Sequence, residues 1–532
     1  MTIIIYIICI IAVVAACIIE LRRQLMMFQQ NSYRPERYRN WLKASAESTS
    51  YWRLGAIIIF LFALTGFTPH AGAEFLAGIF AVAMVLTFGR KKYKKPLAVT
   101  PRVKRMFCTA LVLTTILAAG AWLIWGSTIT DGLYAATFAI MAVICVSPAM
   151  ILLANRLMKP VENRINRKFY NAATDRLASM PDLKIIGVTG SYGKTTTKHY
   201  INALLSEQFS TLMTPGSYNT TLGVVRTVNE YLKPYHEVFV VEMGAKQNGD
   251  IREICDLVHP SIGVVTAVGP QHLESFKTIE NVQATKFELV DALPADGLAV
   301  VNNDFPMIAS RPVNNVPCVR YAVKDAENTD VALYATDIRY TPQGTTFAIV
   351  NRKDGSRLEL STRLVGECNI SNIVAAVAVA KALGVPDDKI RYGVARLEQV
   401  EHRLSIRRIP GGLTIIDDAF NSNPVGSAMA LDVLAAMPGK RILITPGMIE
   451  LGERQFELNR EFGRKAASAC DIAIVVGQYN REAIVSGLEE GGIPVEAIRK
   501  ADSFNAAQEI LHTLAAPGDA VLYENDLPDT FK

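Results

Sequence analysis

Two glycines, a lysine and four threonines lie close together in segment 189–197, TGSYGKTTT. Glycines let backbone N–H groups close around phosphate oxygens, and a following helix adds the positive end of its dipole. Lys194 would neutralise the charge of β- and γ-phosphates, and the Thr195 hydroxyl would ligate Mg²⁺. The spacing GxxGKT is tighter than the common GxxxxGK[ST]. The segment predicts a nucleotide site formed by Gly190, Ser191, Gly193, Lys194, Thr195 and Thr196.

The flanking residues predict the elements that position this loop. Residues 184–188 form a short run rich in β-branched side chains, typical of a buried parallel strand. A helical pattern follows at Tyr200, Ile201, Leu204 and Leu205. Strand, glycine-rich turn and helix are the context that a phosphate loop requires.

Further motifs follow the loop in a fixed order. They are TPGSYNTTLG at 214–223, VVEMGA at 240–245, QHLE at 271–274, ATKFE at 284–288, GECNISN at 366–372, HRL at 402–404, DDAFNSNP at 417–424 and MIELGE at 448–453. Together they resemble the Mur ligases, most closely those that add D-alanyl-D-alanine to a UDP-N-acetylmuramoyl-tripeptide. The resemblance covers about two-thirds of the chain, from Pro181 to Ala520.

The resemblance implies an ATP-dependent, ADP-forming ligase that makes an amide bond through an acyl phosphate. Because the nucleotide and the acceptor are both negatively charged, cations must carry much of the catalysis. The family pattern implies that Glu242 and Thr195 hold Mg²⁺ and that His272 binds a second Mg²⁺. It also implies that Lys286 becomes carbamylated and so turns into a metal-binding anion, although one inserted residue disturbs its motif.

The family pattern assigns further residues to the nucleotide and the acceptor. Asn369 and Asn372 would contact adenine or position nearby loops, and Arg403 would reach the ATP phosphates. Asp418 would bring the C-terminal domain onto the nucleotide. The end of the acceptor peptide would be contacted by Asn219 and Thr220.

Three departures from the family pattern leave the amine substrate open. Cys368 stands where the family has a histidine, and Pro446-Gly447 replaces Gly-Asp. Residues 523–529, YENDLPD, stand where the D-alanyl-D-alanine-adding enzymes have Lys-Gly-Ser. An amino acid or a dipeptide is expected as the amine, and a wall precursor as the acid. Another polymer amide ligase, similar to the poly-γ-glutamate synthases, is an alternative.

Long apolar runs are confined to the first 154 residues of the 532-residue chain, whose mean hydropathy is +0.21. A span needs about 17–25 apolar residues. The sequence predicts five crossings, with the second and third as a tight hairpin or a re-entrant pair. The five segments are Thr2–Ile19, Leu54–Phe67, Gly72–Phe88, Met106–Trp125 and Leu133–Ala154.

The Lys and Arg residues predict the orientation of these segments. They crowd into 20–53, 89–105 and 155–168 and are absent from 68–71 and 126–132. A multi-pass protein of the cell membrane with its N-terminus outside and its catalytic half in the cytoplasm fits this distribution. A net charge of only +5 gives no argument for nucleic acid, and the eight cysteines include no CxxC pair.

The predicted fold is an α-helical membrane domain plus α/β domains. Residues 1–154 would form the membrane domain, 155–180 a cytoplasmic linker, 181–404 a P-loop domain with a mainly parallel sheet, and 405–532 a Rossmann-like α/β domain. Residues 331–359 alternate in polarity and predict a small antiparallel excursion.

The N-terminal region also bears on the acceptor. Only 155–180 lies between the last apolar segment and the ATP domain, which is too short for the uridine-diphosphate-binding domain of the family. A membrane-linked acceptor, such as a lipid-carried peptide or a polymer, is therefore expected. A simple membrane tether is the alternative. A transport ATPase is a further alternative, because a P-loop follows a membrane domain.

Overall fold

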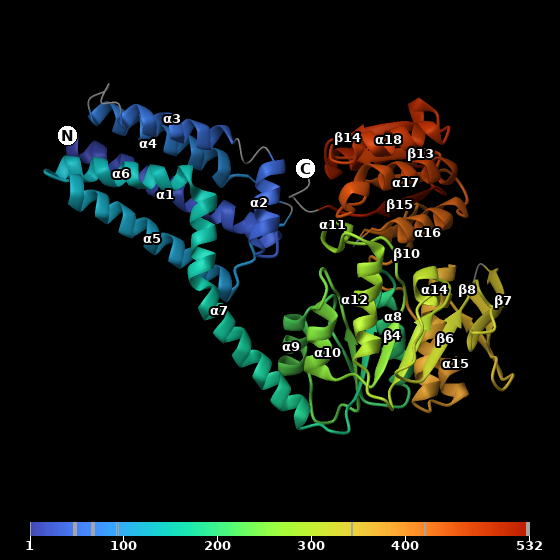
Figure 1. Cartoon of the computed structure of the whole chain (residues 1–532). Coiled ribbons are helices and arrows are strands. Elements are labelled where there is room, and N and C mark those ends of the chain that lie inside the picture. Colours follow the sequence, from blue (N-terminus) through green and yellow to red (C-terminus); the bar gives the residue numbers. More distant parts are fainter. Residues whose placement is uncertain are drawn as a thin grey trace. The chain divides into compact units, whose positions relative to one another are not determined.

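The structure is a computed structural model that describes residues 2–45, 50–64, 70–91, 93, 95–341, 344–419 and 422–527. The chain divides into two compact units, whose limits within the described residues are 2–166 and 167–526. The two units are drawn together in Figure 1. Each is described below by itself.

The N-terminal unit is made of helices, which pack around one apolar core. Small residues such as Ala77 and Ala81 of the fourth helix are fully buried there and let the helices approach closely. The elements are α1 (Thr2–Gln30), α2 (Pro35–Ala44), α3 (Tyr51–Leu64), α4 (His70–Gly89), α5 (Pro101–Trp125), α6 (Ile129–Cys145) and α7 (Ser147–Ala178), whose last turns belong to the second unit.

By length and composition, α1, α4 and α5 are suited to cross a membrane, and the pair α6–α7 makes up to four if it counts as one span. Five crossings were predicted. The second predicted segment, Leu54–Phe67, lies largely in the short helix α3 of 14 residues. Residues 65–67 of the predicted segment lie outside the described part. The fifth segment is not one straight helix, because α6 and α7 meet at an angle of 85°.

Pro148 explains the break between α6 and α7. A proline fits the first turn of a helix, but it has no N–H to donate the backbone hydrogen bond of a helix interior, and it disfavours helical geometry in the residue before it. Accordingly α6 ends at Cys145, and α7 begins anew at Ser147. Helix α7 then runs to Ala178, so the predicted linker 155–180 is almost wholly helical.

The polar segments of the N-terminal unit gather at two ends. The Gln29 side chain, at the end of α1, exchanges two hydrogen bonds of 2.9 Å with the backbone of Ala98. At the opposite end, the Tyr134 hydroxyl donates to Ala63 O over 3.3 Å, and its ring stacks on His70. Gln29 and Ala98 thus lie at one end of the unit, and Ala63, His70 and Tyr134 lie at the other.

The first part of the second unit contains a nine-stranded sheet with the order β2-β3-β1-β4-β5-β6-β7-β8-β9. Strands from β2 to β7 are parallel, and β8 and β9 continue the sheet antiparallel, as predicted. They are β1 (Lys184–Thr189), β2 (Thr211–Met213), β3 (Val238–Glu242), β4 (Ile262–Val265), β5 (Leu298–Asn302), β6 (Cys318–Ala322), β7 (Leu333–Thr341), β8 (Gly344–Asn351) and β9 (Arg357–Thr362).

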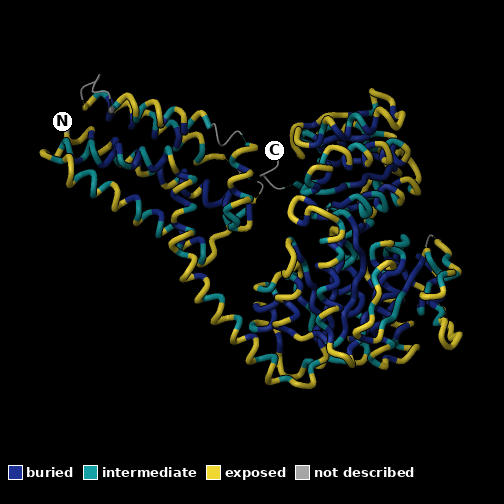
Figure 2. Tube along the Cα trace, in the orientation of Figure 1, coloured by how far each residue is buried: buried dark blue, intermediate teal, exposed yellow. Residues whose placement is uncertain are grey.

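Helices cover both faces of this sheet because successive strand residues point to opposite sides. Ile186 of β1 packs with one set of helices, and Ile185 with the other. The first set is α8 (Lys194–Leu205), α14 (Glu367–Ala382) and α15 (Asp387–Ala395). The second is α9 (Thr221–Glu230), α10 (Asp250–Val258), α12 (Ile279–Asp291) and the end of α7. Two short helices, α11 (Leu273–Phe276) and α13 (Pro306–Ala309), come directly before and after α12 in the order of helices along the chain. The buried strands form the dark core in Figure 2.

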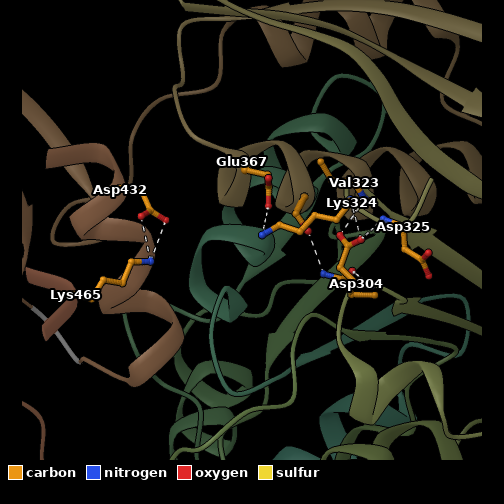
Figure 3. Close-up of polar contacts among 9 residues, drawn as sticks. Asp304, Val323, Lys324, Asp325, Glu367, Asp432 and Lys465 are labelled. Carbon is orange, nitrogen blue, oxygen red and sulfur yellow. Dashed lines mark hydrogen bonds and ion pairs between the residues drawn. The ribbon is translucent and has the colours of Figure 1, made fainter. Parts of the chain in front are cut away.

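The turn after β6 is fixed by a carboxylate. Asp304, just after β5, accepts backbone N–H bonds of 2.9–3.0 Å from Val323, Lys324 and Asp325 (Figure 3). Lys324 then pairs with Glu367 over 3.0 Å and ties this turn to the first residue of α14. Two strand ends and a helix start are therefore held at the carboxyl edge of the sheet.

The last part of the second unit is a six-stranded sheet with the order β10-β11-β15-β12-β13-β14. Only β10 is antiparallel to its neighbour. The strands are β10 (Ser405–Arg408), β11 (Thr414–Asp418), β12 (Arg441–Thr445), β13 (Ile472–Val476), β14 (Ile498–Ala501) and β15 (Ala520–Glu524), and the helices are α16 (Pro424–Ala435), α17 (Gln455–Ala469), α18 (Arg481–Glu490) and α19 (Phe504–Leu514), with 3₁₀ turns η2 (Gly452–Arg454) and η3 (Val495–Ala497). The predicted strands 413–416, 441–445 and 472–476 are confirmed.

Candidate active site

The phosphate loop joins β1 to α8 and is held open by close backbone packing. Gly190 has φ +151°, and a Cβ there would lie 2.1 Å from Thr266 Oγ1. Gly193 has φ +79° and starts α8. Ser191 donates its backbone N–H to Ala267 O at 2.7 Å. Only glycine fits the first position, so the loop keeps a concave backbone that a phosphate can enter.

Lys194 turns back onto this loop. Its Nζ donates to Gly190 O at 2.6 Å and to Ser191 O at 3.1 Å. Burial, partly offset by Glu242, lowers the pKa of Lys194 to about 8. Backbone carbonyls stabilise a buried ammonium group much less than charged phosphate oxygens would. The Lys194 ammonium group can therefore give up its two carbonyl partners for an anion.

The carboxylate of Glu242 at the end of β3 is almost fully buried and has two partners. Lys198 Nζ lies 3.1 Å from Oε2, and Asn219 Nδ2 donates to Oε1 at 2.9 Å. Burial alone would raise the pKa of Glu242, but Lys198 and Lys194 outweigh it and hold the pKa below the usual value. An ionised carboxylate therefore stands beside the phosphate loop.

Lys198 has no role in the sequence prediction, yet it is one of the largest fully buried side chains in the described part of the chain. Its Nζ also donates to Thr214 O at 2.8 Å and Gly216 O at 2.7 Å. It thus ties the predicted acceptor loop to Glu242. The signal was present in the sequence, because a lysine four residues after Lys194 lies one helical turn further along α8.

Lys286 lies on α12 and is 2% exposed. Burial and the nearby charge of Lys194 lower its pKa to about 7. A substantial fraction of this side chain is therefore the neutral amine near neutral pH. The residue inserted before it, Thr285, is also buried and donates to Asn248 Oδ1 at 2.9 Å, so the insertion is absorbed by the neighbouring loop.

His272 meets the C-terminal domain. Its Nδ1 makes a short contact with Glu450 Oε2, and the backbone N–H of Glu274 donates to Glu450 O at 3.2 Å. Burial lowers the pKa of His272 despite this carboxylate. Lys246 Nζ lies 3.9 Å from Glu450 Oε1. The motifs at 271–274 and 448–453 therefore touch, and Glu450 is a site residue to which the sequence prediction gave no role.

The residues after α15 bring a second cation to the loop. Arg403 Nη2 donates to Thr195 Oγ1 at 3.3 Å. Asp418, at the end of β11, accepts from the backbone N–H of Leu404 at 3.0 Å. Burial raises the pKa of Asp418 to about 6. Arg403 thus contacts the first turn of α8, and Asp418 holds the backbone of the residue that follows Arg403.

Asp418 also has an acidic neighbour that the sequence prediction did not name as a site residue. Glu524 is its register partner on the adjacent parallel strand β15, so both side chains point to the same face of the sheet. Glu524 is 1% exposed and accepts from the Ser422 hydroxyl. Burial and Asp418 raise its pKa well above the ordinary value.

Several predicted residues make contacts within the protein. Asn369 accepts from the Tyr200 hydroxyl at 2.8 Å, and Asn372 accepts from Thr197 at 3.0 Å, so both join α14 to α8. Thr220 accepts from Gly223 N and caps α9. Thr196 is buried in the first turn of α8. Phe420 and Asn421 of the 417–424 motif lie outside the described residues.

A cavity of about 770 Å³ begins at Thr195 and Arg403. It runs along the face of α8 that carries His199 and Ala203, and residues 396–403 form its opposite wall. Gly216 and Ser217 of the predicted acceptor loop also line it. The cavity therefore reaches the first turn of α8 at Thr195, and it is large enough for a ligand.

The arrangement was compared with known proteins. Residues 188–380 match the Mur ligase middle domain, and residues 402–523 match the Mur ligase, glutamate ligase domain. The UDP-N-acetylmuramoyl-tripeptide–D-alanyl-D-alanine ligase of Escherichia coli (strain K12) is 33% identical over 305 residues, 56% of this chain and 65% of that one. This match spans just under two-thirds of the E. coli ligase.

The ligase of the same name from Synechocystis sp. (strain ATCC 27184 / PCC 6803 / Kazusa) is 30% identical over 345 residues, 64% of this chain and 71% of that one. Among solved structures, MurF from Acinetobacter baumannii has a TM-score of 0.61 at 25% identity, covering 68% of this chain and 77% of its own. MurF from Thermotoga maritima in complex with ADP has a TM-score of 0.60 at 27% identity, covering 68% and 80%. The chain belongs to the Mur ligase family, as its motifs predicted.

Proposed function

We propose that this protein joins a carboxylic acid to an amine by way of an acyl phosphate. The acceptor carboxylate attacks the γ-phosphorus of ATP, the bond to ADP breaks, and the amine then attacks the acyl carbon and expels phosphate. The observation that carries the proposal is the gathering of Lys194, Lys198 and Arg403 around the buried carboxylate of Glu242. Such fixed cations stabilise the charge that phosphoryl transfer develops.

The residues present fit ATP and Mg²⁺. The Gly190 cradle excludes a side chain, and the carbonyl contacts of Lys194 leave room for a stronger anionic partner. Carboxylate oxygens are ligands that Mg²⁺ prefers, and each Glu242 oxygen keeps a lone pair beyond its present partner. Thr195, Glu242 and His272 would hold Mg²⁺, which neutralises phosphate charge. In the described residues no three His, Cys, Asp or Glu side chains form a metal site alone, so phosphate oxygens would complete it.

Lys286 supports the proposed carbamylation. A neutral amine attacks the carbon of CO₂, loses a proton and becomes a carbamate anion. The low pKa of Lys286 provides that neutral amine near pH 7. The anion would be offset by Lys194, whose charge already acts on this side chain. The carbamate would thereby add an oxygen ligand at the metal site.

We assign the substrates by class. The named relatives join a UDP-N-acetylmuramoyl-tripeptide to D-alanyl-D-alanine, which supports a peptidoglycan precursor as the acid and a small amino compound, an amino acid or dipeptide, as the amine. The acidic residues Glu524 and Asp526 stand where those enzymes are expected to have Lys-Gly-Ser. The basic residue that could pair with a dipeptide carboxylate is therefore replaced, so the amine is where this protein is expected to differ.

We further propose that the N-terminal unit anchors the enzyme in the cell membrane, with the second unit in the cytoplasm. Its helices expose large apolar side chains, among them Ile8 and Ile11 of α1, Ile79 of α4 and Ile116 of α5. Apolar surface of this extent suits a lipid environment. A membrane-linked acceptor would then be concentrated near the site.

Phosphate release tests the ligase proposal. Purified full-length protein is incubated with ATP, Mg²⁺ and a panel of wall precursors, each with and without D-alanyl-D-alanine, single amino acids or glutamate. We expect release only when an acid and an amine are both present, with equal formation of ADP and amide product. Phosphate release that requires neither an acid nor an amine would reject the ligase proposal.

A reporter fusion tests the proposed orientation. A reporter inserted at Ser127–Thr130, the turn before α6, is expected on the outer side of the membrane, and one at Lys104 on the cytoplasmic side. The reason is that 126–132 carries no Lys or Arg, whereas 89–105 is strongly basic. A cytoplasmic signal from Ser127–Thr130 would be incompatible with this topology.

A further inference from the structure

Arg53 is the most unusual buried charge of the N-terminal unit. It stands near the start of α3, and only 9% of its surface is exposed. Two of its guanidinium nitrogens, Nε and Nη2, are buried, and neither has a hydrogen-bond partner among the residues that the structure describes. A buried charged donor without a partner is costly, so a site that keeps one is suited to a ligand that supplies the acceptor.

Other cations surround the start of α3. Trp52 packs on Phe88 of α4, with ring centroids 5.7 Å apart. The guanidinium of Arg23 lies 4.5 Å from the centre of the same Phe88 ring, and Lys91 Nζ lies 6.0 Å from it. Arg23 and Lys91 therefore meet at the Phe88 ring, and Arg53 directly follows the Trp52 that packs on this ring.

Two carboxylates of the N-terminal unit are engaged by other arginines. Both oxygens of Glu20 accept from Arg23, at 2.9 and 3.1 Å, and one of them also accepts from Gln24 and Ser147. Glu162 makes a two-pronged pair with Arg105, at 2.6 and 2.9 Å. Neither of these acids accepts from Arg53, so an anion from outside the protein can supply the acceptor that its Nε and Nη2 lack among the described residues.

The place of Arg53 narrows the chemistry of that anion. Arg53 lies at the basic end of the unit, and the exposed apolar side chains Leu54 and Ile58 follow it along α3. In a membrane this is the level of the lipid phosphates. A guanidinium fork gives two parallel hydrogen bonds to phosphate oxygens. We propose that Arg53, supported by Arg23 and Lys91, forms a binding site for the phosphate group of an anionic lipid. The proposal is independent of the ligase activity.

Lipid binding to full-length protein tests this site. The protein, in an uncharged detergent, is titrated with phosphatidylglycerol in mixed micelles, and tryptophan fluorescence is followed because Trp52 is next to Arg53. We expect saturable binding that Arg53→Gln weakens by about tenfold or more, the loss expected for a charged hydrogen bond. The matched control is Arg22→Gln, which removes the same charge from an exposed position on α1. It should change the affinity less than about twofold, because an exposed charge contributes little.

Parallel titrations identify the source of the phosphate. Binding of phosphatidylglycerol but not of inorganic phosphate supports a lipid headgroup, and equal binding of both supports the same site with a soluble phosphate as its ligand. Arg53→Lys keeps the charge but loses the fork and should give an intermediate affinity. If Arg22→Gln and Arg53→Gln weaken binding equally, or if binding does not saturate, the attraction is diffuse and the site is rejected.

Thermal unfolding keeps the test valid if a variant is unstable. In lipid-free detergent, Arg53→Gln should unfold at the same temperature as the wild type or higher, because it removes a buried charge without a partner. Phosphatidylglycerol should raise the unfolding temperature of the wild type but not of this variant. A large loss of stability in Arg53→Gln without lipid would show that Arg53 is already satisfied by the protein, and it would overturn the proposal.

Discussion

Lys194 donates to two carbonyls of its own loop, a pairing that ATP would replace. We predict that Lys194→Ala lowers the ligation rate by about 10²-fold or more, since it removes one preorganised charge from the transition state. ADP formation with saturating substrates measures this loss. Lys233→Ala removes an exposed lysine from a turn and should leave the rate unchanged. A Lys194→Ala enzyme with wild-type turnover would exclude this loop as the site.

The pKa of Lys286 leads to a prediction about stability and pH. Its folded-state pKa of about 7 lies below the unfolded value near 10.5, so the unfolded chain binds more protons between these values. This group therefore destabilises the fold fully below pH 7, and the cost disappears as the pH rises toward 10. Without CO₂, Lys286→Met should raise the free energy of unfolding by a few kcal/mol at pH 6.5 and by little at pH 10.

Chemical denaturation in degassed buffer at the two pH values measures this difference. With ¹³C-bicarbonate at neutral pH, the wild type should show a carbamate resonance that Lys286→Met lacks. A variant that is equally stabilised at both pH values would show that packing, not charge, explains the effect. A missing carbamate signal in an active enzyme would remove the proposed modification.

Individual site residues differ in how far the sequence could predict them. Lys194 follows from loop chemistry alone, because glycines and a lysine before a helix have few other uses. The interaction of Lys198 with Glu242 does not follow, since it joins residues 44 positions apart through a parallel pair of strands. The contact between His272 and Glu450 links two domains and is equally invisible to local patterns.

At the scale of elements, periodicity predicted the sheets well. β12 is an apolar run between Arg441 and Thr445, β13 is an apolar run between Asp471 and Gly477, and the limits of both were predicted correctly. The helices of the N-terminal unit were harder, because hydropathy records composition and not direction. It merged α6 and α7, although Ser147-Pro148 marks a helix start. It also overlooked that α7 continues through the polar residues to Ala178.

The ends of β11 and β15 support a prediction about two buried acids. Asp418 and Glu524 are register partners with raised pKa values, so the folded state holds protons that the unfolded state releases. Their contribution is favourable at low pH, and it is lost as the pH rises from about 4 through about 6 and beyond. Glu524→Gln should therefore raise the unfolding temperature at pH 8 by several degrees and leave it nearly unchanged at pH 4.5.

Differential scanning calorimetry at the two pH values measures this effect. The matched control is Glu509→Gln, which neutralises an exposed residue of α19 in the same domain. Glu524→Gln should stabilise more than this control at pH 8 only. A destabilised variant at pH 8 would mean that the Glu524 carboxylate is ionised and paired, contrary to the burial and neighbouring charge described here.

At the scale of the whole molecule, the sequence predicted a helical region followed by two α/β domains, and the structure adds that the end of α7 packs onto the catalytic unit. Ala173 of α7 is fully buried in the core of that unit, and Arg176 donates to Asn229 O at 2.8 Å. The predicted start near residue 181 would remove both contacts. The compact unit begins instead at Arg167, a limit that only the packing of α7 reveals.

This limit defines the last prediction, which separates a membrane-linked acceptor from a simple tether. A variant lacking residues 1–166 keeps the phosphate loop, Glu242, Lys286 and the C-terminal domain, so it should fold and use a soluble precursor as fast as the full-length enzyme does. With the same acceptor on its lipid carrier, in mixed vesicles, the full-length enzyme should be at least about tenfold faster, because co-localisation raises the effective concentration. A variant starting at residue 181 is the control for folding, and it should lose stability through the missing end of α7. Equal rates of the full-length and shortened enzymes on the lipid-linked acceptor would leave the helices as an anchor alone.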